Sequence, residues 1–364
     1  MSNKKQIHYN MDNLIKKDAL YNMIIGERAN GKSYQVKHKK AIQPFLDNKE
    51  KFVYMRRFKE EIKSSTIEAY FNDVDFVKLT NGKYNTVQYW RNRIYLANYD
   101  METAKLHRGE QLGYCMALNQ EQNFAGGSYL DVTNIIFEEF MSRSIYVSQE
   151  PDKLQNLYST IDRKRGKTKI WLVGNVITRA CPYLVQWNLL KDVARMNQGD
   201  ILVKEIPVDE KNTIRLAIEY TGHIKDSTSF VFGNNADMIN KGEWQSEPQP
   251  HLPKSYNDYI VLFRCLFIYK TFSYIGEVLI DSETKEKVWF IYPKTKIYDN
   301  LYPLLTFSDI IKPSKYYNSD IYHCKIDNKR IQGYCDLFTE DNIFYSDDLT
   351  GTEFKNVINF TISK

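Results

Sequence analysis

The sequence predicts an α/β protein of two domains, the first with a mostly parallel sheet and helices on both faces, the second smaller and rich in strands. Between residues 21 and 175, short apolar runs alternate with segments long enough for helices, as in sheets joined by helical crossovers. After residue 209 the chain becomes polar, and residues 235–255 contain three prolines and few apolar residues, which is typical of a linker. The predicted domains are therefore 1–209 and 253–364, joined by a linker segment at 210–252.

Apolar runs mark the individual elements. YNMIIG at 21–26 predicts a short buried strand, and the residues at 32–46 predict a helix that ends near Pro44. In the second domain, the apolar runs at 259–280 and 287–293 flank the turn-like DSETKEK and predict antiparallel strands. The further strands predicted in the first domain are 51–57, 113–119, 133–140 and 167–175.

Composition limits the classes of function. The longest strongly apolar run, 260–269, is about half a membrane span, and the N-terminus lacks the apolar core of a signal peptide. We therefore expect a protein of the cytoplasm that is not secreted and has no membrane partner. The five cysteines form no C-x-x-C pair and the six histidines no ligand pattern, so neither a zinc site nor a disulfide framework is predicted.

The net charge of +5 is unevenly divided. Residues 1–209 hold 32 Lys and Arg against 24 Asp and Glu, which gives +8. Residues 210–364 hold 18 against 21, which gives −3. A basic first half favours a partner with nucleic-acid phosphates, although solvated surfaces often carry an excess of this size.

The stretch GERANGKS fits the pattern G-x-x-x-x-G-K-[ST] and lies between a predicted strand and a predicted helix. Its glycines let backbone N–H groups turn toward a β-phosphate at a helix N-terminus. Lys32 would reach the β- and γ-phosphates, and the Ser33 hydroxyl would ligate Mg²⁺. The alternative is a glycine-containing turn of an unrelated fold. ATP and Mg²⁺ are the predicted ligands, with the loop formed by Gly26, Glu27, Arg28, Ala29, Asn30, Gly31, Lys32 and Ser33.

Two predicted strands end in polar residues suited to ATP hydrolysis. TNIIFEEF runs into Glu138 and Glu139, and KIWLVGN ends in Asn175. In P-loop ATPases of the additional-strand, catalytic-glutamate group, the first acid contacts Mg²⁺ through water and the second orients or deprotonates the attacking water. The usual first acid is Asp, whereas this chain has Glu138. An amide at the place of Asn175 senses the γ-phosphate or holds the water, although Asn also caps strand ends.

Two basic clusters remain. IDRKRGK at 161–167 precedes the strand of Asn175, and Arg56, Arg57 and Lys59 follow the second strand. A solvated basic surface is the ordinary explanation for both. For the first cluster, the functional alternative is an arginine that projects toward the γ-phosphate of a neighbouring subunit.

Over most of its first half, the chain resembles the DNA-packaging ATPases of phi29-like tailed phages. The resemblance rests on IIGERANGKSY, on FVYMRRFKEE with YFNDV, on NIIFEEF, on LQNLYSTIDRKRGK, and on LVGNVIT with CPYLVQWN. It implies a terminase-like motor of the host cytoplasm: a homo-oligomeric ring, with five subunits expected. The ring would dock transiently on the portal, or connector, of a viral procapsid and drive double-stranded DNA into it by ATP hydrolysis. Whether a structural RNA takes part is left open.

The resemblance also implies roles for single residues. Arg163 matches the arginine that acts in trans, with Arg165 as the second candidate. Arg56 and Lys59 match a cluster at the nucleotide lid and subunit interface, and Asn175 matches the residue that couples the γ-phosphate to movement. The second domain would resemble a ribonuclease-H-like nuclease that has lost its metal-binding carboxylates. In agreement, 260–269 contains no acid, and Glu277, Asp281 and Asp336 show no two-metal spacing.

The chain departs from the family pattern at one loop, and three other functions compete with DNA packaging. The family carries a basic loop that faces the pore, but 119–130 contains no lysine here, so Asn119, Gln120 or Asn123 are the candidates for DNA contact. The competing interpretations are another nucleic-acid translocase or helicase, a P-loop kinase of a small molecule, and a non-catalytic nucleotide switch.

Overall fold

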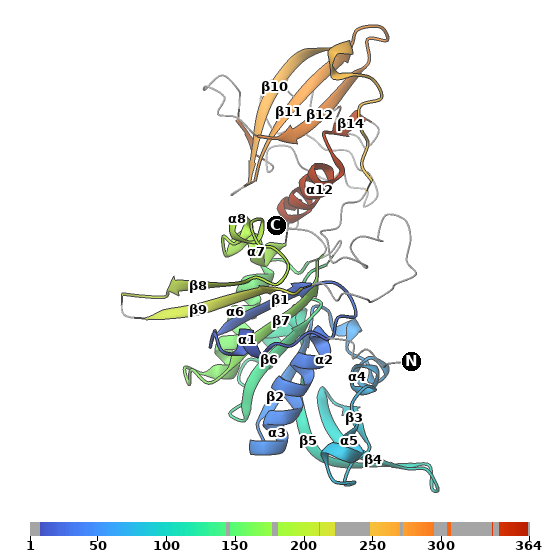
Figure 1. Cartoon of the computed structure of the whole chain (residues 1–364), viewed down its shortest axis with the longest axis vertical. Coiled ribbons are helices and arrows are strands. Elements are labelled where there is room, and N and C mark those ends of the chain that lie inside the picture. Colours follow the sequence, from blue (N-terminus) through green and yellow to red (C-terminus); the bar gives the residue numbers. More distant parts are fainter. Residues whose placement is uncertain are drawn as a thin grey trace, which may run out of the picture. The chain divides into compact units, whose positions relative to one another are not determined.

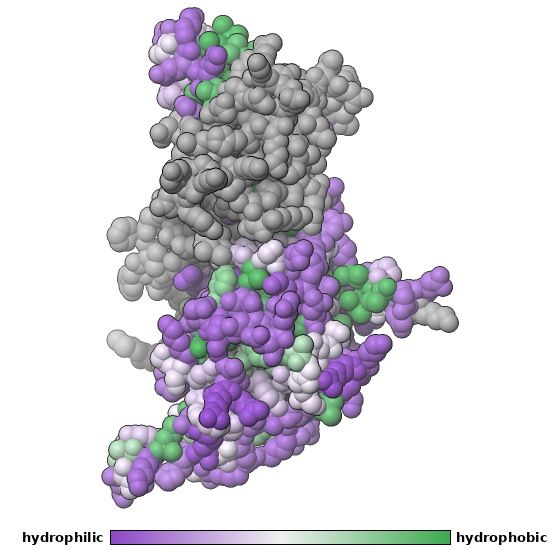
Figure 2. Space-filling view, turned by 180° about the vertical axis from the view of Figure 1, so that it is seen from behind, coloured by the Kyte–Doolittle hydropathy of each residue, from purple (hydrophilic) through white to green (hydrophobic). Residues whose placement is uncertain are grey.

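The computed structural model describes residues 8–142, 146–176, 181–210, 212–222, 248–269, 272–294, 304–306, 337 and 342–362. These residues form two compact units (Figure 1). The first contains strands β1 to β9, and the second contains strands β10 to β14. No helix in the described ranges is long and apolar enough to cross a membrane. In Figure 2, the visible surface of the first unit is mostly hydrophilic, with hydrophobic residues in small separate groups.

The first unit is built on a nine-stranded sheet in the order β3-β4-β5-β2-β6-β7-β1-β9-β8. Its centre, from β5 to β9, is parallel, and the pairs β3–β4, β4–β5 and β8–β9 are antiparallel. Strand β7 lies between β1 and β6, so the strand that leads into the phosphate loop and the strand of the two glutamates are not neighbours. The strands are β1 Tyr21–Gly26, β2 Lys51–Arg56, β3 Thr86–Trp90, β4 Arg93–Asp100, β5 Lys105–Ala117, β6 Val132–Glu138, β7 Lys169–Asn175, β8 Ile201–Pro207 and β9 Thr213–Tyr220.

Helices cover both faces of this sheet. Side chains alternate between the two faces along each strand, and the central strands are buried along most of their length, so both faces are buried. Tyr54, Ile136 and Trp171 form one core cluster with Val36 and Phe45 of the helices after β1. Figure 1 shows α2 and α3 on the near side of the sheet and α6 on the far side. The helices are α1 Asp12–Ile15, α2 Lys32–Lys37, the π-helical η1 His38–Ile42, α3 Gln43–Asn48, η2 Lys59–Glu61, α4 Ser64–Phe71, α5 Phe76–Leu79, η3 Leu118–Phe124 and α6 Glu150–Asp162.

The predicted helix after the first strand is confirmed, but Pro44 does not end it. The π-helical turn resets the register, and Pro44 then lies in the first turn of α3, where a missing N–H is tolerated. The helix continues to Asn48 and ends at Lys49, which has a φ of 58°.

The predicted central strands are confirmed to within two residues, whereas the edges of the sheet differ. The run at 113–119 is the end of the longer β5, and the hairpin of β3 and β4 was not predicted. Strand β9 lies within the predicted linker, yet it pairs with β1 from Tyr21↔Leu216 to Ile25↔Tyr220. The predicted boundary at 209 therefore divides the β8–β9 hairpin. Residues 223–247, most of the predicted linker, lie outside the described residues.

The second unit has a five-stranded sheet in the order β13-β10-β11-β12-β14. The predicted antiparallel strands are confirmed as β10, β11 and β12, while β13 and β14 pair in parallel at the two edges. Helices α7 and α8 come from within the predicted first domain but cluster with this unit. The elements are α7 Pro182–Gln186, α8 Leu190–Val193, η4 Tyr256–Asp258, β10 Tyr259–Tyr269, β11 Phe272–Asp281, β12 Lys287–Pro293, β13 Leu304–Thr306, β14 Ile343–Tyr345 and α12 Asp348–Ile362.

Two of the three acids considered for a metal site in the second unit, Glu277 and Asp281, are engaged within the protein. Glu277 is fully buried and accepts bonds from Arg264, from Tyr256 at 2.6 Å and from Tyr292 at 2.9 Å. Asp281 pairs with Lys254. In the described ranges no group of three metal-ligating side chains exists, and Asp336 lies outside those ranges.

Candidate nucleotide site

The loop between β1 and α2 is fixed by two glycines and by the end of β9. A Cβ atom at Gly26 would lie 1.8 Å from Thr221 Oγ1, so a side chain does not fit there. Gly31 has a φ of 96°, a conformation that glycine adopts without strain. Asn30 Nδ2 donates to Thr221 Oγ1 at 2.7 Å, which ties the loop to the residue after β9. The predicted loop therefore lies at the N-terminus of α2, where backbone N–H groups attract anions.

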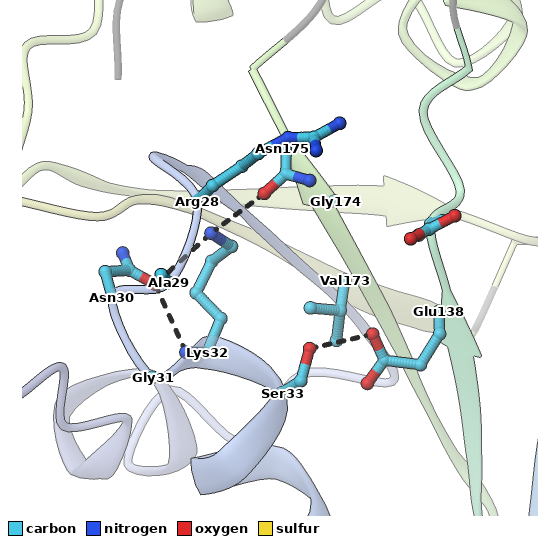
Figure 3. A pocket seen from close by; sticks show the side chains of 11 residues that line it. Arg28, Ala29, Asn30, Gly31, Lys32, Ser33, Glu138, Val173, Gly174 and Asn175 are labelled. Atoms are coloured by element: carbon cyan, nitrogen blue, oxygen red, sulfur yellow. Dashed lines mark hydrogen bonds between the residues drawn. The ribbon is translucent and has the colours of Figure 1, made fainter. Parts of the chain in front are cut away.

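Lys32 is buried at this loop, with only 5% of its surface exposed. Its Nζ donates to the Glu27 carbonyl, to Asn30 Oδ1 at 3.2 Å and to Asn175 Oδ1 at 3.4 Å (Figure 3). Burial lowers the pKa of Lys32 to about 8, although Glu138 and Glu27 oppose this shift. The Lys32 ammonium has three N–H donors, and all three now bond to uncharged oxygens of the protein. A bound phosphate would accept hydrogen bonds from these same donors.

Glu138 at the end of β6 faces the same loop. Ser33 Oγ donates to Glu138 Oε2 at 2.9 Å, and the Tyr70 hydroxyl of α4 donates to Oε1 at 3.1 Å. Burial raises the pKa of Glu138, while these two hydrogen bonds oppose the shift. No lysine or arginine of the described residues forms an ion pair with Glu138. A buried carboxylate beside a hydroxyl, without a paired cation, is a donor set that fits Mg²⁺.

These groups line one pocket of about 310 Å³ at the carboxyl ends of β1, β6 and β7 (Figure 3). In a parallel sheet the carboxyl ends of the strands share one edge, which is where ligands of α/β proteins bind. The pocket brings together residues separated by more than 140 positions in the sequence. Its lining residues are Arg28, Ala29, Asn30, Gly31, Lys32, Ser33, Glu138, Glu139, Val173, Gly174 and Asn175.

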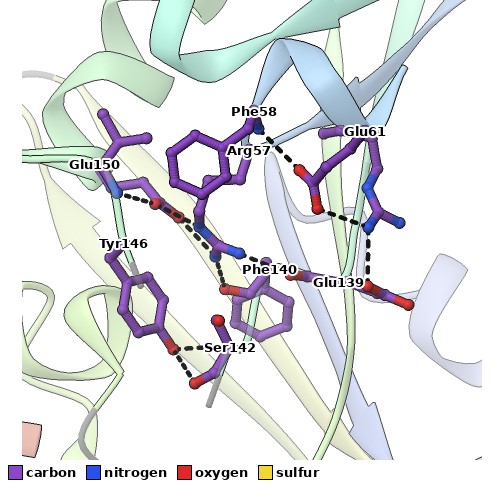
Figure 4. A network of polar contacts seen from close by, with 10 residues as sticks. Arg57, Phe58, Glu61, Glu139, Phe140, Ser142, Tyr146 and Glu150 are labelled. Atoms are coloured by element: carbon purple, nitrogen blue, oxygen red, sulfur yellow. Dashed lines mark hydrogen bonds and ion pairs between the residues drawn. The ribbon is translucent and has the colours of Figure 1, made fainter. Parts of the chain in front are cut away.

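Glu139 turns the chain sharply at the pocket edge. It has a φ of 58°, in the left-handed region, and its side chain is 63% exposed. Arg56 Nη2 donates to Glu139 Oε2 at 2.9 Å and also contacts Glu61 Oε1 at 2.9 Å (Figure 4). The structure therefore places Arg56 beside the acid predicted to orient water.

Arg57 is buried, so the solvated surface expected for it is wrong. It forms two bonds with Glu150, Nε to Oε2 at 2.7 Å and Nη2 to Oε1 at 2.9 Å. Its Nη1 donates to the Glu139 carbonyl at 3.3 Å and its Nη2 to the Phe140 carbonyl at 2.5 Å (Figure 4). The guanidinium thus fixes the backbone turn at Glu139 against the first residue of α6.

Three other predicted residues lie away from the pocket of their own chain. Lys59 Nζ donates to Tyr89 Oη at 3.2 Å and to Asn92 Oδ1 at 2.5 Å, near the β3–β4 turn. Arg163 and Arg165 follow α6 and precede β7, whereas Asn175 ends β7. A strand of this length spans about 20 Å, so both arginines lie toward the opposite edge of the sheet.

The two arginines differ in their surroundings. Arg165 Nη2 donates to the backbone carbonyls of Val132 at 3.1 Å and Ile161 at 3.2 Å, and further bonds reach the carbonyls of Tyr129, Leu130 and Asp162. Arg163 is exposed, and its Nη2 donates to the Gly127 carbonyl at 2.6 Å. Arg165 is therefore held in place within its own chain, while Arg163 has a single side-chain bond at the surface.

The candidates for DNA contact belong to η3. Asn123 is exposed, and Asn119 and Gln120 are half-buried. Helix η3 follows β5 in the chain, and the Asn119 N–H donates to the Arg57 carbonyl at 3.0 Å, so the start of η3 lies beside the end of β2.

Sequence reasoning missed Tyr70, Thr221 and Glu150. Tyr70 contacts Glu138, Thr221 contacts Gly26, and Glu150 contacts Arg57. The two residues of each pair are between 68 and 195 positions apart in the sequence. No local motif marks any of them. For Arg57, the apolar run of β2 was the available signal, because it brings the following residues close to the core.

Residues 3–230 match the family model of the podovirus DNA encapsidation protein (Gp16). The DNA packaging protein of Bacillus phage B103 is 31% identical over 237 residues, which cover 62% of this chain and 68% of that protein. The DNA packaging protein of Bacillus phage phi29 is 30% identical over 212 residues, 56% of this chain and 57% of its own length. A solved structure of the phi29 viral genome packaging motor assembly has a TM-score of 0.51, with 19% identity over 97% of this chain and 99% of that chain. The last similarity shows a shared fold.

Proposed function

Because the chain belongs to the podovirus DNA encapsidation protein (Gp16) family, we propose that it is the ATPase that drives double-stranded viral DNA into a preformed procapsid. The observation that carries the proposal is the pocket in which Lys32, Ser33 and the two acids of β6 converge. The match to the phi29 relative spans little more than half of its length, so the activity is argued from the residues of this chain.

The groups of the pocket suit hydrolysis of a nucleoside triphosphate. Lys32 and the loop N–H groups would bind the β- and γ-phosphates, as in other P-loops. Ser33 and Glu138 would hold Mg²⁺, which when bound neutralises charge between these phosphates. Glu139, at the mouth of the pocket, would orient the attacking water and accept its proton. Asn175, 3.4 Å from Lys32 Nζ, would contact the γ-phosphate from the neighbouring strand.

The strand order supports an ATPase of the additional-strand, catalytic-glutamate type. Strand β7 lies between the strand of the phosphate loop and the strand of the acids, and it ends in Asn175. For the second unit we propose a ribonuclease-H-like domain that does not cut nucleic acid. Its support is the buried Glu277, which is engaged by Arg264 and two tyrosines rather than facing a metal.

Arg163 is the proposed trans-acting arginine of a homo-oligomeric ring. It is exposed, and it lies at the opposite end of β7 from Asn175, where it cannot serve its own pocket. Arg56 and Lys59 are proposed members of the lid and subunit interface. The proposed setting is the host cytoplasm, with the ring of five docked on the portal; the proposal does not require a structural RNA.

The test is steady-state ATP hydrolysis by the purified chain, with and without double-stranded DNA, beside a Glu139→Gln variant. We expect turnover that DNA stimulates and that the variant loses, while the variant still binds ATP. A parallel assay with added procapsids separates the motor from a helicase-type translocase: a further change in turnover supports packaging, and DNA-stimulated turnover that procapsids leave unchanged favours the translocase. Turnover that ignores DNA and requires a small phosphate acceptor would identify a kinase and refute the motor.

A further inference from the structure

One face of the strands β3, β4 and β5 carries arginines interleaved with aromatic rings. Trp90 pairs with Arg93 across β3 and β4, and Tyr95 is two residues further along β4, so the three side chains share a face. We call the set of Trp90, Arg91, Arg93, Tyr95 and Arg108 the arginine–aromatic face. It lies at one edge of the large sheet, next to the β3–β4 turn (Figure 1).

Two guanidinium groups stack on the indole of this face. The Cζ atoms of Arg91 and Arg108 lie 4.4 and 4.0 Å from the centroid of Trp90, and Arg108 also lies 5.0 Å from the ring centroid of Tyr95. Arg108 Nε donates to Gln88 Oε1 at 2.9 Å. Stacking orders these side chains in advance, so less conformational entropy is lost when their N–H groups bind a ligand. Trp90 nevertheless stays 37% exposed.

The turn that carries Arg91 is itself unusual. Arg91 and Asn92 have φ values of 47° and 59°, as a two-residue type I′ hairpin requires. Such turns favour Asn and Gly, because a side chain at positive φ is strained. Arg91 therefore occupies its place in the turn at a conformational cost.

The arginines of this face lack acidic partners. No described carboxylate forms an ion pair with Arg91, Arg93 or Arg108, and all three are exposed. Three acids of the neighbouring segments have other partners. Glu110 pairs with Lys49 and Lys83, Asp131 pairs with Lys51, and Asp100 bonds to Thr103 within its own turn.

The positive surface extends toward Arg163. Tyr129 packs edge-on against Tyr114 of β5, with ring centroids 5.3 Å apart. Burial and Tyr114 raise the pKa of Tyr129, and both Arg93 and Arg163 oppose that rise, so both cations act on this phenol.

We propose that the arginine–aromatic face binds the phosphodiester backbone of a nucleic acid. Three exposed guanidinium groups that form no ion pair with any carboxylate of the described residues match a row of phosphates, and the tryptophan offers a ring edge to sugars and bases. The proposal rests on the proposed function for its partner class and deepens it: it places a contact outside residues 119–130. A duplex, an unpaired DNA strand and an RNA share this backbone chemistry.

The experiment measures binding of the full-length chain to three fluorescein-labelled 20-mers of one sequence: duplex DNA, single-stranded DNA and RNA. Anisotropy is recorded from 50 to 300 mM NaCl. The variants are Arg91→Ala, Arg93→Ala and Arg108→Ala, singly and combined, with Arg195→Ala as the matched control because Arg195 is exposed in the same unit. Arg108→Lys keeps the charge and removes the planar stacking group.

Each single substitution should weaken binding on the order of fivefold and lower the slope of log affinity against log salt by about 1. The combined variant should lower the slope by about 3, while Arg195→Ala stays within twofold of the parent and basal ATP hydrolysis and the unfolding temperature stay unchanged. The 20-mer with the largest loss identifies the natural source of the backbone.

Parental affinity and salt slope in the combined variant would overturn the proposal and leave the motor assignment standing. Loss of self-association without loss of nucleic-acid binding would also overturn it, because the face would then contact another copy of the chain. If the parent chain bound none of the three 20-mers, the binding role of this face and the proposed nucleic-acid partner would both be refuted. The motor assignment is tested separately by ATP hydrolysis with and without DNA.

Discussion

Replacing Arg57 with Met should destabilise the first unit strongly, because Glu150 would then be a buried charge without its partner. Arg57 is 5% exposed and the Glu150 side chain is fully buried, and two charge-assisted hydrogen bonds of 2.7 and 2.9 Å join them. Breaking one side of a buried ion pair costs about 3–5 kcal/mol. The Val147 N–H still donates to Glu150 Oε2, so we expect a loss near the lower end, about 3 kcal/mol.

The double variant Arg57→Met/Glu150→Met separates the charge pair from simple packing. Two apolar side chains of similar volume leave no uncompensated charge, so the double variant should be more stable than Arg57→Met alone. Urea unfolding curves of the parent, both single variants and the double variant give the coupling free energy directly. A coupling of about 2 kcal/mol or more is expected.

The same substitution should lower turnover at unchanged nucleotide affinity. Arg57 holds the carbonyls of Glu139 and Phe140, and Glu139 itself has a positive φ, so the position of its carboxylate depends on this anchor. ATP hydrolysis is measured well below the unfolding transition, beside direct titration of ATP binding. A single variant that loses less than about 1 kcal/mol, or that hydrolyses ATP at the parental rate, would refute this reasoning.

Three further predictions concern Lys32, Arg163 and Arg165. Burial lowers the pKa of Lys32 to about 8 in the nucleotide-free chain, and a bound phosphate would raise it. Above about pH 8, ATP binding must then take up a proton. The affinity of the parent chain should change little below about pH 8 and fall above it, by up to tenfold per pH unit, whereas the affinity of Lys32→Arg should not change with pH over this range. Arg163→Ala should keep its stability and lose turnover only in the assembled ring, while Arg165→Ala should unfold at lower urea because Arg165 bonds to several carbonyls. Equal loss of turnover by Arg163→Ala at dilutions that contain only monomers would contradict the trans role.

Local sequence was sufficient for the parts of this protein whose signal is carried by neighbouring residues. The strand–loop–helix unit from residue 21 to 33 needs glycines, a lysine and a serine at fixed spacing, and it was predicted at its observed position. The acids and Asn175 were located because parallel strands bring their carboxyl ends to one edge.

Only the tertiary structure decided which of these residues have partners and which residues those partners are. Arg56 and Arg57 are adjacent and chemically identical in the sequence, yet one contacts the exposed Glu139 carboxylate and the other is buried against Glu150, 93 residues away. Strand β9 appeared polar enough for a linker, but its hydrogen bonds to β1 complete the sheet and bring Thr221 against Gly26. Burial and ion pairing depend on contacts between distant segments, and a pattern of neighbouring residues contains no record of those distances.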